Sequence, residues 1–281
     1  MLFFRRGPVV PVLRLSGPIG MATPLRAGLG ISAAAGAIEK AFAASKLPSV
    51  AVIVNSPGGS PVQSHLIFKR IRQLAQEKGK RVYVFCEDVA ASGGYFLALA
   101  GDEIYADPSS IIGSIGVISA SFGFDKAIDK LGIERRVHTA GTNKGTLDPF
   151  LPEKADDVER LKALQRDVHD VFIGIVKDRR AGRLKGPDTE LFSGAFWSAA
   201  KALDYGLIDG ISDVRTRMRE LHGERVRLKA IPLGGGGLLS RFRRLPGSSL
   251  GSGDGFAFPT PLADDLLSAV EARALWARFG L

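Results

Sequence analysis

Residues 88–97 read DVAASGGYFL and stand where a strand pattern gives way to a helix pattern. The run before them, RVYVF at 81–85, is typical of a buried strand, and the apolar run YFLALA that follows is typical of a helix. A serine at such a junction, here Ser92, aims its hydroxyl into a cleft beside the free N–H groups and the dipole of the helix start. The two glycines after it let a substrate carbonyl approach the backbone closely. Ser92 is therefore a candidate nucleophile, and the alternative is a serine that only caps the helix.

Strand and helix patterns alternate on both sides of this junction, which predicts an α/β fold of parallel βαβ units packed around a sheet. The expected strands are 9–15, 50–59, 81–85, 102–106, 134–140 and 225–229, and the expected helices are 31–45, 61–78, 95–100, 124–133, 152–180 and 212–222. Pro11 suggests that the first strand lies at an edge. Ser60 and Gln63 predict a capping box at the start of the 61–78 helix.

The composition excludes several classes of protein. Lysine and arginine outnumber the acidic residues 38 to 29, but no zinc spacing or aromatic-studded basic motif accompanies them, so we expect no nucleic-acid partner. The single cysteine, Cys86, excludes an internal disulfide and a thiolate metal cluster. We expect neither a metal nor a cofactor.

The chain divides at a change in composition near Pro232. We expect a single domain over 1–232, a flexible Gly/Ser/Arg linker over 233–260 and an amphipathic helix over 261–281. No apolar run reaches the roughly 18 residues that span a membrane, and no signal peptide is apparent. We therefore expect a cytoplasmic protein, with peripheral membrane contact through the basic C-terminal region as a further expectation.

Acyl transfer from a serine needs a base for its proton and N–H donors for the developing oxyanion. The usual base is a histidine. The four histidines carry no motif, and each has a structural or solvated role as its simplest explanation; they are His65, His138, His169 and His222. A histidine-based triad stays open, although nothing in the sequence supports it.

Four motifs together resemble the signal peptide peptidase A family, also called protease IV. They are NSPGG at 55–59, AASGGYFLA at 90–98, IIGSIGVI at 111–118 and TNKG at 142–145. The resemblance rests on their order and spacing and implies a Clp-protease/crotonase-like spiral fold as a single compact domain. It also implies a serine peptidase that uses a Ser–Lys dyad.

The resemblance assigns roles to five residues. It implies Ser92 as nucleophile and Lys144, which follows 52 residues later at an interval similar to that of single-repeat family members, as general base. It implies the backbone N–H groups of Gly59 and Gly93 as oxyanion donors. Ser114 matches the serine that orients the lysine amine in the family.

A lysine can act as a general base only when its amine is neutral, which its ordinary pKa prevents at neutral pH. A free lysine has a pKa near 10.4, so Lys144 needs burial in a charge-poor setting that lowers its pKa by about 3 units. Its sequence neighbours are small and uncharged, which permits this. We expect that none of the nearest acids, Glu87, Asp88 and Asp148, contacts the amine, because a carboxylate there would keep it protonated.

These features predict a serine endopeptidase that cleaves unfolded hydrophobic peptides, such as signal-peptide remnants or membrane-protein fragments. The resemblance supplies this substrate class, and it also implies a homo-oligomer in the form of a ring or bowl. Two alternatives stay open: a crotonase-like enzyme acting on acyl-CoA, and a non-catalytic membrane-associated scaffold.

Overall fold

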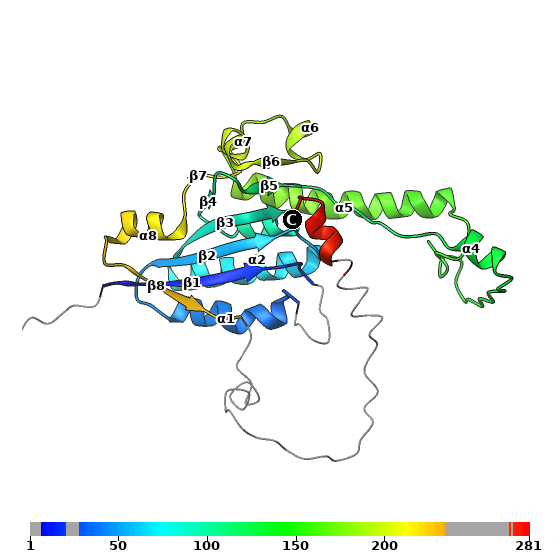
Figure 1. The fold of residues 1–281 in the computed structure, drawn as a ribbon, viewed down its shortest axis with the longest axis horizontal. Coiled ribbons are helices and arrows are strands. Elements are labelled where there is room, and N and C mark those ends of the chain that lie inside the picture. Colours follow the sequence, from blue (N-terminus) through cyan, green and yellow to red (C-terminus); the bar gives the residue numbers. More distant parts are fainter. Residues whose placement is uncertain (1–6, 21–27, 234–269, 271) are drawn as a thin grey trace, which may run out of the picture.

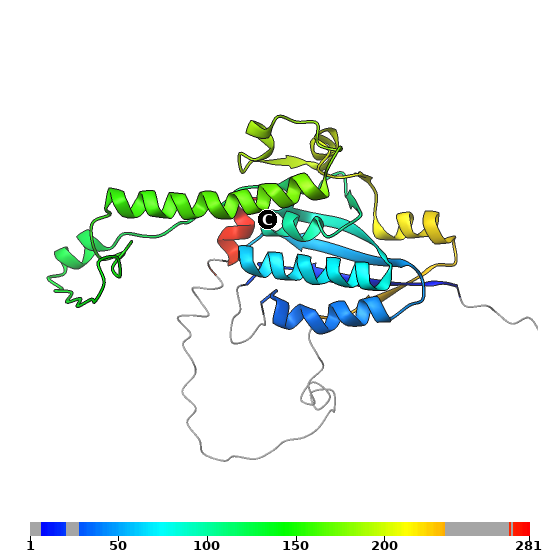
Figure 2. The same cartoon turned by 180° about the vertical axis from the view of Figure 1, so that it is seen from behind.

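The computed structural model describes residues 7–20, 28–233, 270 and 272–281 of the 281-residue chain. The described elements are β1 (Val9–Ser16), α1 (Ile31–Ala43), β2 (Ser49–Ser56), α2 (Pro61–Lys78), β3 (Arg81–Ala91), α3 (Gly93–Ala98), β4 (Glu103–Ala106), β5 (Ile111–Gly113), α4 (Asp125–Lys130), α5 (Ala155–Arg179), α6 (Asp188–Leu191), β6 (Phe196–Ser198), α7 (Ala199–Asp204), β7 (Gly210–Ile211), α8 (Val214–His222) and β8 (Arg227–Ile231). Figure 1 shows their arrangement around one sheet, and Figure 2 shows the opposite side. The α/β class predicted from the alternating patterns is confirmed.

The sheet is mostly parallel and has the strand order β6-β5-β3-β2-β1-β8, with β4 pairing β3 and β7 beside this path. Only the β5–β6 pair is antiparallel among the described strands. The long strand β3 serves two neighbours in turn: its first half, Tyr83–Cys86, pairs with β4, and its second half, Val89–Ala91, pairs with β5. The carboxyl end of β3, where Ser92 follows, therefore lies inside the sheet and next to β5.

The sheet has two unequal faces. On one face α1, α2, α3 and α5 cover the main core, into which alternate residues of β2 and β3, such as Val52, Val54, Val82 and Val84, point. On the other face a smaller cluster around Phe85 and Tyr105 packs against Met218 of α8. The nearly continuous apolar run of β2 follows from burial on both faces, as expected for a parallel sheet.

Three local expectations are wrong. Pro11 does not mark an edge, because β1 lies between β2 and β8; its missing N–H costs no bond to β2, since that pairing begins at Val12. The capping box is only half formed. Ser60 Oγ accepts from the Gln63 N–H, but the Gln63 side chain accepts from the N–H of Ile31 at the start of α1 instead.

The strand expected at residues 134–140 is absent, because this segment finds no partner strand.

A long exposed segment, which we call the arm, comprises residues 118–154 and includes α4. Figures 1 and 2 show the arm projecting beyond the sheet, beside the first turns of α5. No residue from 116 to 156 is buried. The exposed large apolar side chains of the arm are Ile118, Phe122, Phe124, Leu131, Ile133, Val137, Leu147 and Leu151. The apolar side chains of α5 are buried only in its second half, at Phe172 and Val176.

The C-terminal residues return to the sheet. Phe279 packs with Val89 and Ala91 of β3, and its ring meets that of Phe196 at 5.0 Å. Helical structure covers residues 272–277 of the expected 261–281 helix, whose earlier part and nearly all of the expected 233–260 linker lie outside the described residues. In the described part of the chain, none of the helices combines the length and apolar character needed to cross a membrane.

Candidate active site

Ser92 occupies a strained backbone conformation between β3 and α3. Its φ of 52° and ψ of −122° are seldom adopted by residues with a side chain, and strain of this kind costs roughly 1–3 kcal/mol and gathers at functional sites. The Ser92 N–H donates to the Gly113 carbonyl (2.8 Å), which ties the turn to β5. Its side chain makes no capping hydrogen bond to α3. The capping alternative therefore does not explain this serine, whose hydroxyl stays available.

The backbone N–H groups of Gly59 and Gly93 lie next to each other beside Ser92. A Cβ placed on Gly93 would sit 3.3 Å from the Gly59 nitrogen, and one on Gly58 would sit 2.8 Å from Ser92 Cβ. Neither N–H donates to any acceptor in the described part of the chain. Two unengaged donors beside a serine hydroxyl have the arrangement that stabilises an oxyanion.

The NSPGG loop keeps this shape through two side chains. Asn55 Nδ2 donates to Asp88 (2.6 Å), and its Oδ1 accepts from the Val89 N–H (3.3 Å), which braces the irregular middle of β3. Ser56 Oγ donates to the Gly17 carbonyl (2.7 Å) and accepts from the Gly58 N–H (3.2 Å). These bonds of Asn55 and Ser56 hold the loop that carries the Gly59 N–H next to Gly93, and the two short side chains leave the site open.

An apolar groove of about 220 Å³ begins at Ser92. Its walls come from the first turns of α2, from α3, from the irregular segment between β5 and the arm, and from the middle of α5; they are formed by Gly59, Pro61, Val62, His65, Leu66, Ser92, Gly93, Phe96, Gly116, Val117, Val168, Val171 and Phe172. Val62, Leu66 and Val171 remain largely exposed on its rim. The groove suits one or two apolar side chains of a substrate rather than a large cofactor.

Tyr95 anchors the helix that starts at this site. Its hydroxyl is buried and donates to the Leu207 carbonyl (2.7 Å). Burial raises the pKa of Tyr95 well above its ordinary value, so the phenol stays protonated and keeps donating throughout the neutral range. This bond connects α3 to the segment after α7 and so helps to fix the position of the Ser92 turn.

Ser114, expected to orient the base, lies near Ser92 through the backbone. It directly follows Gly113, the acceptor of the Ser92 N–H, and is itself buried with a φ of 52°. Its own N–H donates to the Ala195 carbonyl (2.7 Å). Ser92 and Ser114, both with a positive φ, thus directly follow the ends of the paired strands β3 and β5.

Lys144 is placed elsewhere. It lies in the arm, is exposed and does not line the groove that contains Ser92. Ser92, Gly59, Gly93 and Ser114 are therefore brought together within one chain, and Lys144 is not. The buried setting expected for its amine is absent in the single chain.

The three acids expected to avoid Lys144 all have other partners. Asp148 pairs with Arg135, and the Phe150 N–H, together with the Arg135 guanidinium, lowers the pKa of that carboxyl. Glu87 pairs with Arg14, and Asp88 accepts from Asn55. No contact between these carboxylates and the Lys144 amine occurs.

The structure adds one residue that the sequence reasoning placed outside the site. His65 lies on the groove wall, where its ring packs at 5.7 Å from Phe96 and 6.3 Å from Phe68. Its spacing from Pro61 and Val62 along α2 puts all three on one face of the helix, a signal that only becomes readable once Ser92 is known to face that helix.

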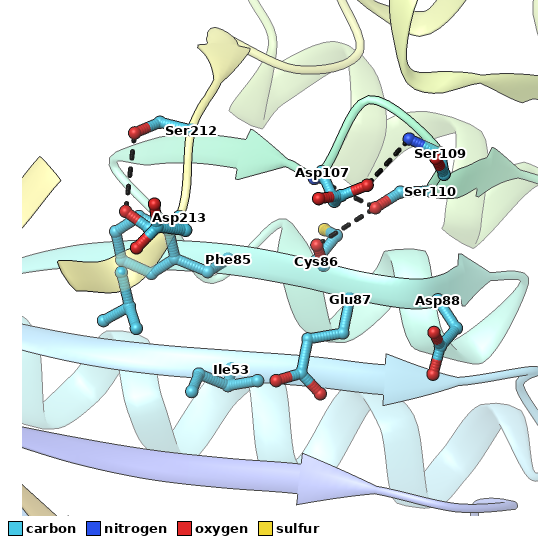
Figure 3. Close-up of a pocket in the computed structure, with 11 residues that line it drawn as sticks. Ile53, Phe85, Cys86, Glu87, Asp88, Asp107, Ser109, Ser110, Ser212 and Asp213 are labelled. Atoms are coloured by element: carbon cyan, nitrogen blue, oxygen red, sulfur yellow. Dashed lines mark hydrogen bonds between the residues drawn. The ribbon is translucent and has the colours of Figure 1, made fainter. Parts of the chain in front are cut away.

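A second, larger hollow of about 330 Å³ lies on the opposite face of the sheet, between β3 and the start of α8. Figure 3 shows its acidic lining, with Asp107 bonded to the Ser109 N–H. Glu87 and Asp88 are engaged as described above, and Asp213 accepts from the N–H groups that open α8. No cluster of three or more metal-binding side chains occurs in the residues that the structure places. Ser92 and its donor pair thus remain the better candidate site.

Comparison with known proteins decides the family. The model of peptidase family S49 matches residues 74–226, which is more than half of the chain and includes α3 and the Ser92 turn. The chain belongs to peptidase family S49. The resemblance to signal peptide peptidases read from the four motifs is confirmed, and the S49 family comprises serine proteases.

Named relatives agree and also show that the chain corresponds to part of longer proteins. Protease 4 of Haemophilus influenzae is 32% identical over 177 residues, 62% of this chain and 28% of that protein. The chloroplastic serine protease SPPA of Arabidopsis thaliana is 29% identical over 170 residues, 59% of this chain and 24% of that protein.

A more similar relative has a different name. The protein called Na(+)/H(+) antiporter NhaA in Brucella abortus is 56% identical over 275 residues, which are 97% of this chain and 37% of that protein. This chain therefore spans little more than a third of that relative, and the shared part contains the S49 match.

Proposed function

We propose that this S49 chain is a serine endopeptidase in which Ser92 is the nucleophile and Lys144 is the general base. The observation that carries the proposal is the Ser92 turn: a strained serine stands at the head of an apolar groove, next to two N–H groups that find no acceptor among the residues the structure describes. This combination serves acyl transfer, whereas a scaffold would gain nothing from it.

The reaction follows from these positions. Neutral Lys144 accepts the Ser92 proton while Ser92 Oγ attacks the substrate carbonyl, and the oxyanion forms toward the N–H groups of Gly59 and Gly93. Collapse of the tetrahedral intermediate breaks the peptide bond, and the Lys144 ammonium returns the proton to the leaving amine. Water, deprotonated by the same amine, then hydrolyses the acyl-enzyme.

We propose that Lys144 reaches Ser92 in a second copy of the chain. In the single chain the arm is exposed and carries eight large apolar side chains with no core of their own, as an interface element would. The open groove and the uncovered first half of α5 offer apolar surface at the end of the sheet where such an arm would dock. Docking would also bury Lys144, which a neutral amine requires.

The apolar groove supports an unfolded, hydrophobic peptide as the substrate, because an extended chain could lay a side chain between α2 and α5. Signal-peptide remnants and membrane-protein fragments have this chemistry. The family's Clp-protease/crotonase-like spiral and its ring or bowl assembly complete the proposal and would keep folded proteins away from Ser92.

The test uses the wild type and the variants Ser92→Ala and Lys144→Ala on a fluorogenic hydrophobic peptide. We expect both variants to lose activity by at least about 10³-fold, because nucleophile and base act as one unit. Wild-type turnover should rise as the pH increases above neutral, because the base must be deprotonated.

Lys126→Ala is the matched control, since Lys126 is another exposed lysine of the arm. It should keep wild-type activity. Full activity of Lys144→Ala, or a rate that is flat from about pH 6 to 9, would rule out the lysine base.

A further inference from the structure

His65 is the single ionisable side chain among the residues that form the Ser92 groove. It projects from the second turn of α2, half-buried, with its ring against Phe96 in the groove wall. The other side-chain surfaces around it are aliphatic or aromatic, apart from Ser92 itself. The imidazole of His65 therefore places a hydrogen-bonding group in an otherwise apolar wall of the groove.

The ring nitrogens of His65 have no hydrogen-bond partner within the described part of the chain. Its ring packs against two aromatic rings, with centroid distances of 6.3 Å to Phe68 and 5.7 Å to Phe96, and this packing holds it in place. At neutral charge an imidazole offers one donor and one acceptor. A substrate side chain that covered His65 without bonding to it would leave these groups unsatisfied, which weakens binding.

The position of the groove identifies the substrate residue concerned. Because the groove begins at Ser92 and Gly93, the substrate side chain nearest to it belongs to the residue whose carbonyl is attacked. A side chain that entered the groove would lie between α2 and Phe172 of α5, beside His65.

We propose that His65 is a specificity-determining residue, which makes the groove favour an apolar side chain with a hydrogen-bonding tip, such as tyrosine, over a wholly apolar one of the same shape. This proposal rests on the proposed peptidase function and adds a substrate preference to it. The aromatic ring is held by Phe96 and Phe172, and the hydroxyl bonds to the imidazole. A site that binds a substrate hydroxyl discriminates against the analogue that lacks it, because the partner is left unpaired.

The experiment measures kcat/KM for two peptides that differ only in tyrosine or phenylalanine before the cleaved bond. For the wild type we expect tyrosine to be favoured by about fivefold, the value of one neutral hydrogen bond. His65→Phe should abolish or reverse this preference, since it keeps a ring against Phe96 but removes the polar atoms. His65→Gln, which restores a donor and an acceptor, should recover part of it.

Lys69→Ala is the control. Lys69 lies one turn further along α2, is exposed and does not line the groove, so the tyrosine-to-phenylalanine ratio should not change. An equal ratio in the wild type and His65→Phe would overturn the specificity role. Loss of activity on both peptides in His65→Phe and His65→Gln, in folded protein, would also overturn it and would point to a histidine base.

Failure of this inference can be told apart from failure of the proposed function. If Ser92→Ala still cleaves either peptide at the wild-type rate, the serine peptidase assignment fails whatever the ratio. If Ser92→Ala is inactive but the tyrosine-to-phenylalanine ratio of kcat/KM is the same in the wild type and in His65→Phe, only the specificity inference fails.

Discussion

The Ser92 region, residues 89–100, and the arm that carries Lys144 differ in burial, in crowding and in exposed apolar surface. Every residue from 89 to 100 is buried except Ser92, whereas no residue from 116 to 156 is. The first region sits between β5, α2 and α5, and its backbone is crowded enough that several glycines could not accept a side chain. The second has exposed apolar side chains and glycines with open space around them.

Under the proposed function, this difference separates the nucleophile and oxyanion donors of the active site from its base. A nucleophile and its oxyanion donors must be held rigidly, and burial in the core achieves this. A base supplied from an exposed arm is positioned only when the arm finds a surface to cover. Activity would then depend on assembly, and the free chain would be inert.

The largest contrast should appear when glycine is replaced by alanine in each region. A Cβ on Gly94 would lie 2.3 Å from the backbone oxygen of Ser56, which cannot move without shifting β2. Gly94→Ala should therefore lower the free energy of unfolding by about 3 kcal/mol. A Cβ on Gly145 in the arm would have no neighbouring atom within 4 Å, so Gly145→Ala should change the free energy of unfolding by less than about 0.5 kcal/mol. Urea unfolding of both variants checks this, and equal stability would contradict the crowding at the Ser92 turn.

The next contrast compares two phenylalanines. Phe279 is buried against Val89, Ala91 and Phe196, so Phe279→Ala should cost about 2 kcal/mol and also lower turnover, because Ala91 directly precedes Ser92. Phe122 of the arm is 80% exposed, and Phe122→Ala should leave the unfolding of the isolated chain unchanged. Thermal unfolding at low protein concentration measures both. A stable Phe279→Ala variant would show that the C-terminal residues do not support the site.

The smallest effect concerns the strain at Ser92. Glycine adopts the backbone angles of this turn freely, so Ser92→Gly removes strain that Ser92→Ala retains. After the entropy cost of glycine is subtracted, Ser92→Gly should unfold with a free energy about 1 kcal/mol higher than Ser92→Ala. The comparison needs only the two inactive variants in denaturant. A less stable Ser92→Gly variant would mean that the turn is relaxed.

The regular part of the fold was predictable because its signals are local. The apolar run of β2, the Ser60 cap with Pro61 and the glycine at position 79 mark their elements by spacing and turn chemistry. The expected strand at 134–140 was wrong because a β pattern needs a partner strand, and the arm offers none. For the same reason, Pro11 could not reveal that β8 returns to pair with β1.

The candidate site was predictable in part. The glycines and Ser92 stand out because a strand-to-helix junction with small residues has a clear physical use. His65 could not be assigned from its position in α2, since only the packing of α2 against α3 and α5 turns it toward Ser92. The exposed position of Lys144 could not be predicted, because no local pattern indicates that the arm finds no surface to cover in the single chain.

Mixing the two inactive variants tests the central claim most directly. Ser92→Ala supplies an intact Lys144, and Lys144→Ala supplies an intact Ser92, so co-expressed chains can form complete sites only between copies. With random pairing of equal amounts, we predict recovery of about a quarter of the wild-type activity, while each variant alone stays inactive. A mixture that assembles like the wild type and remains inactive would contradict a site shared between two copies.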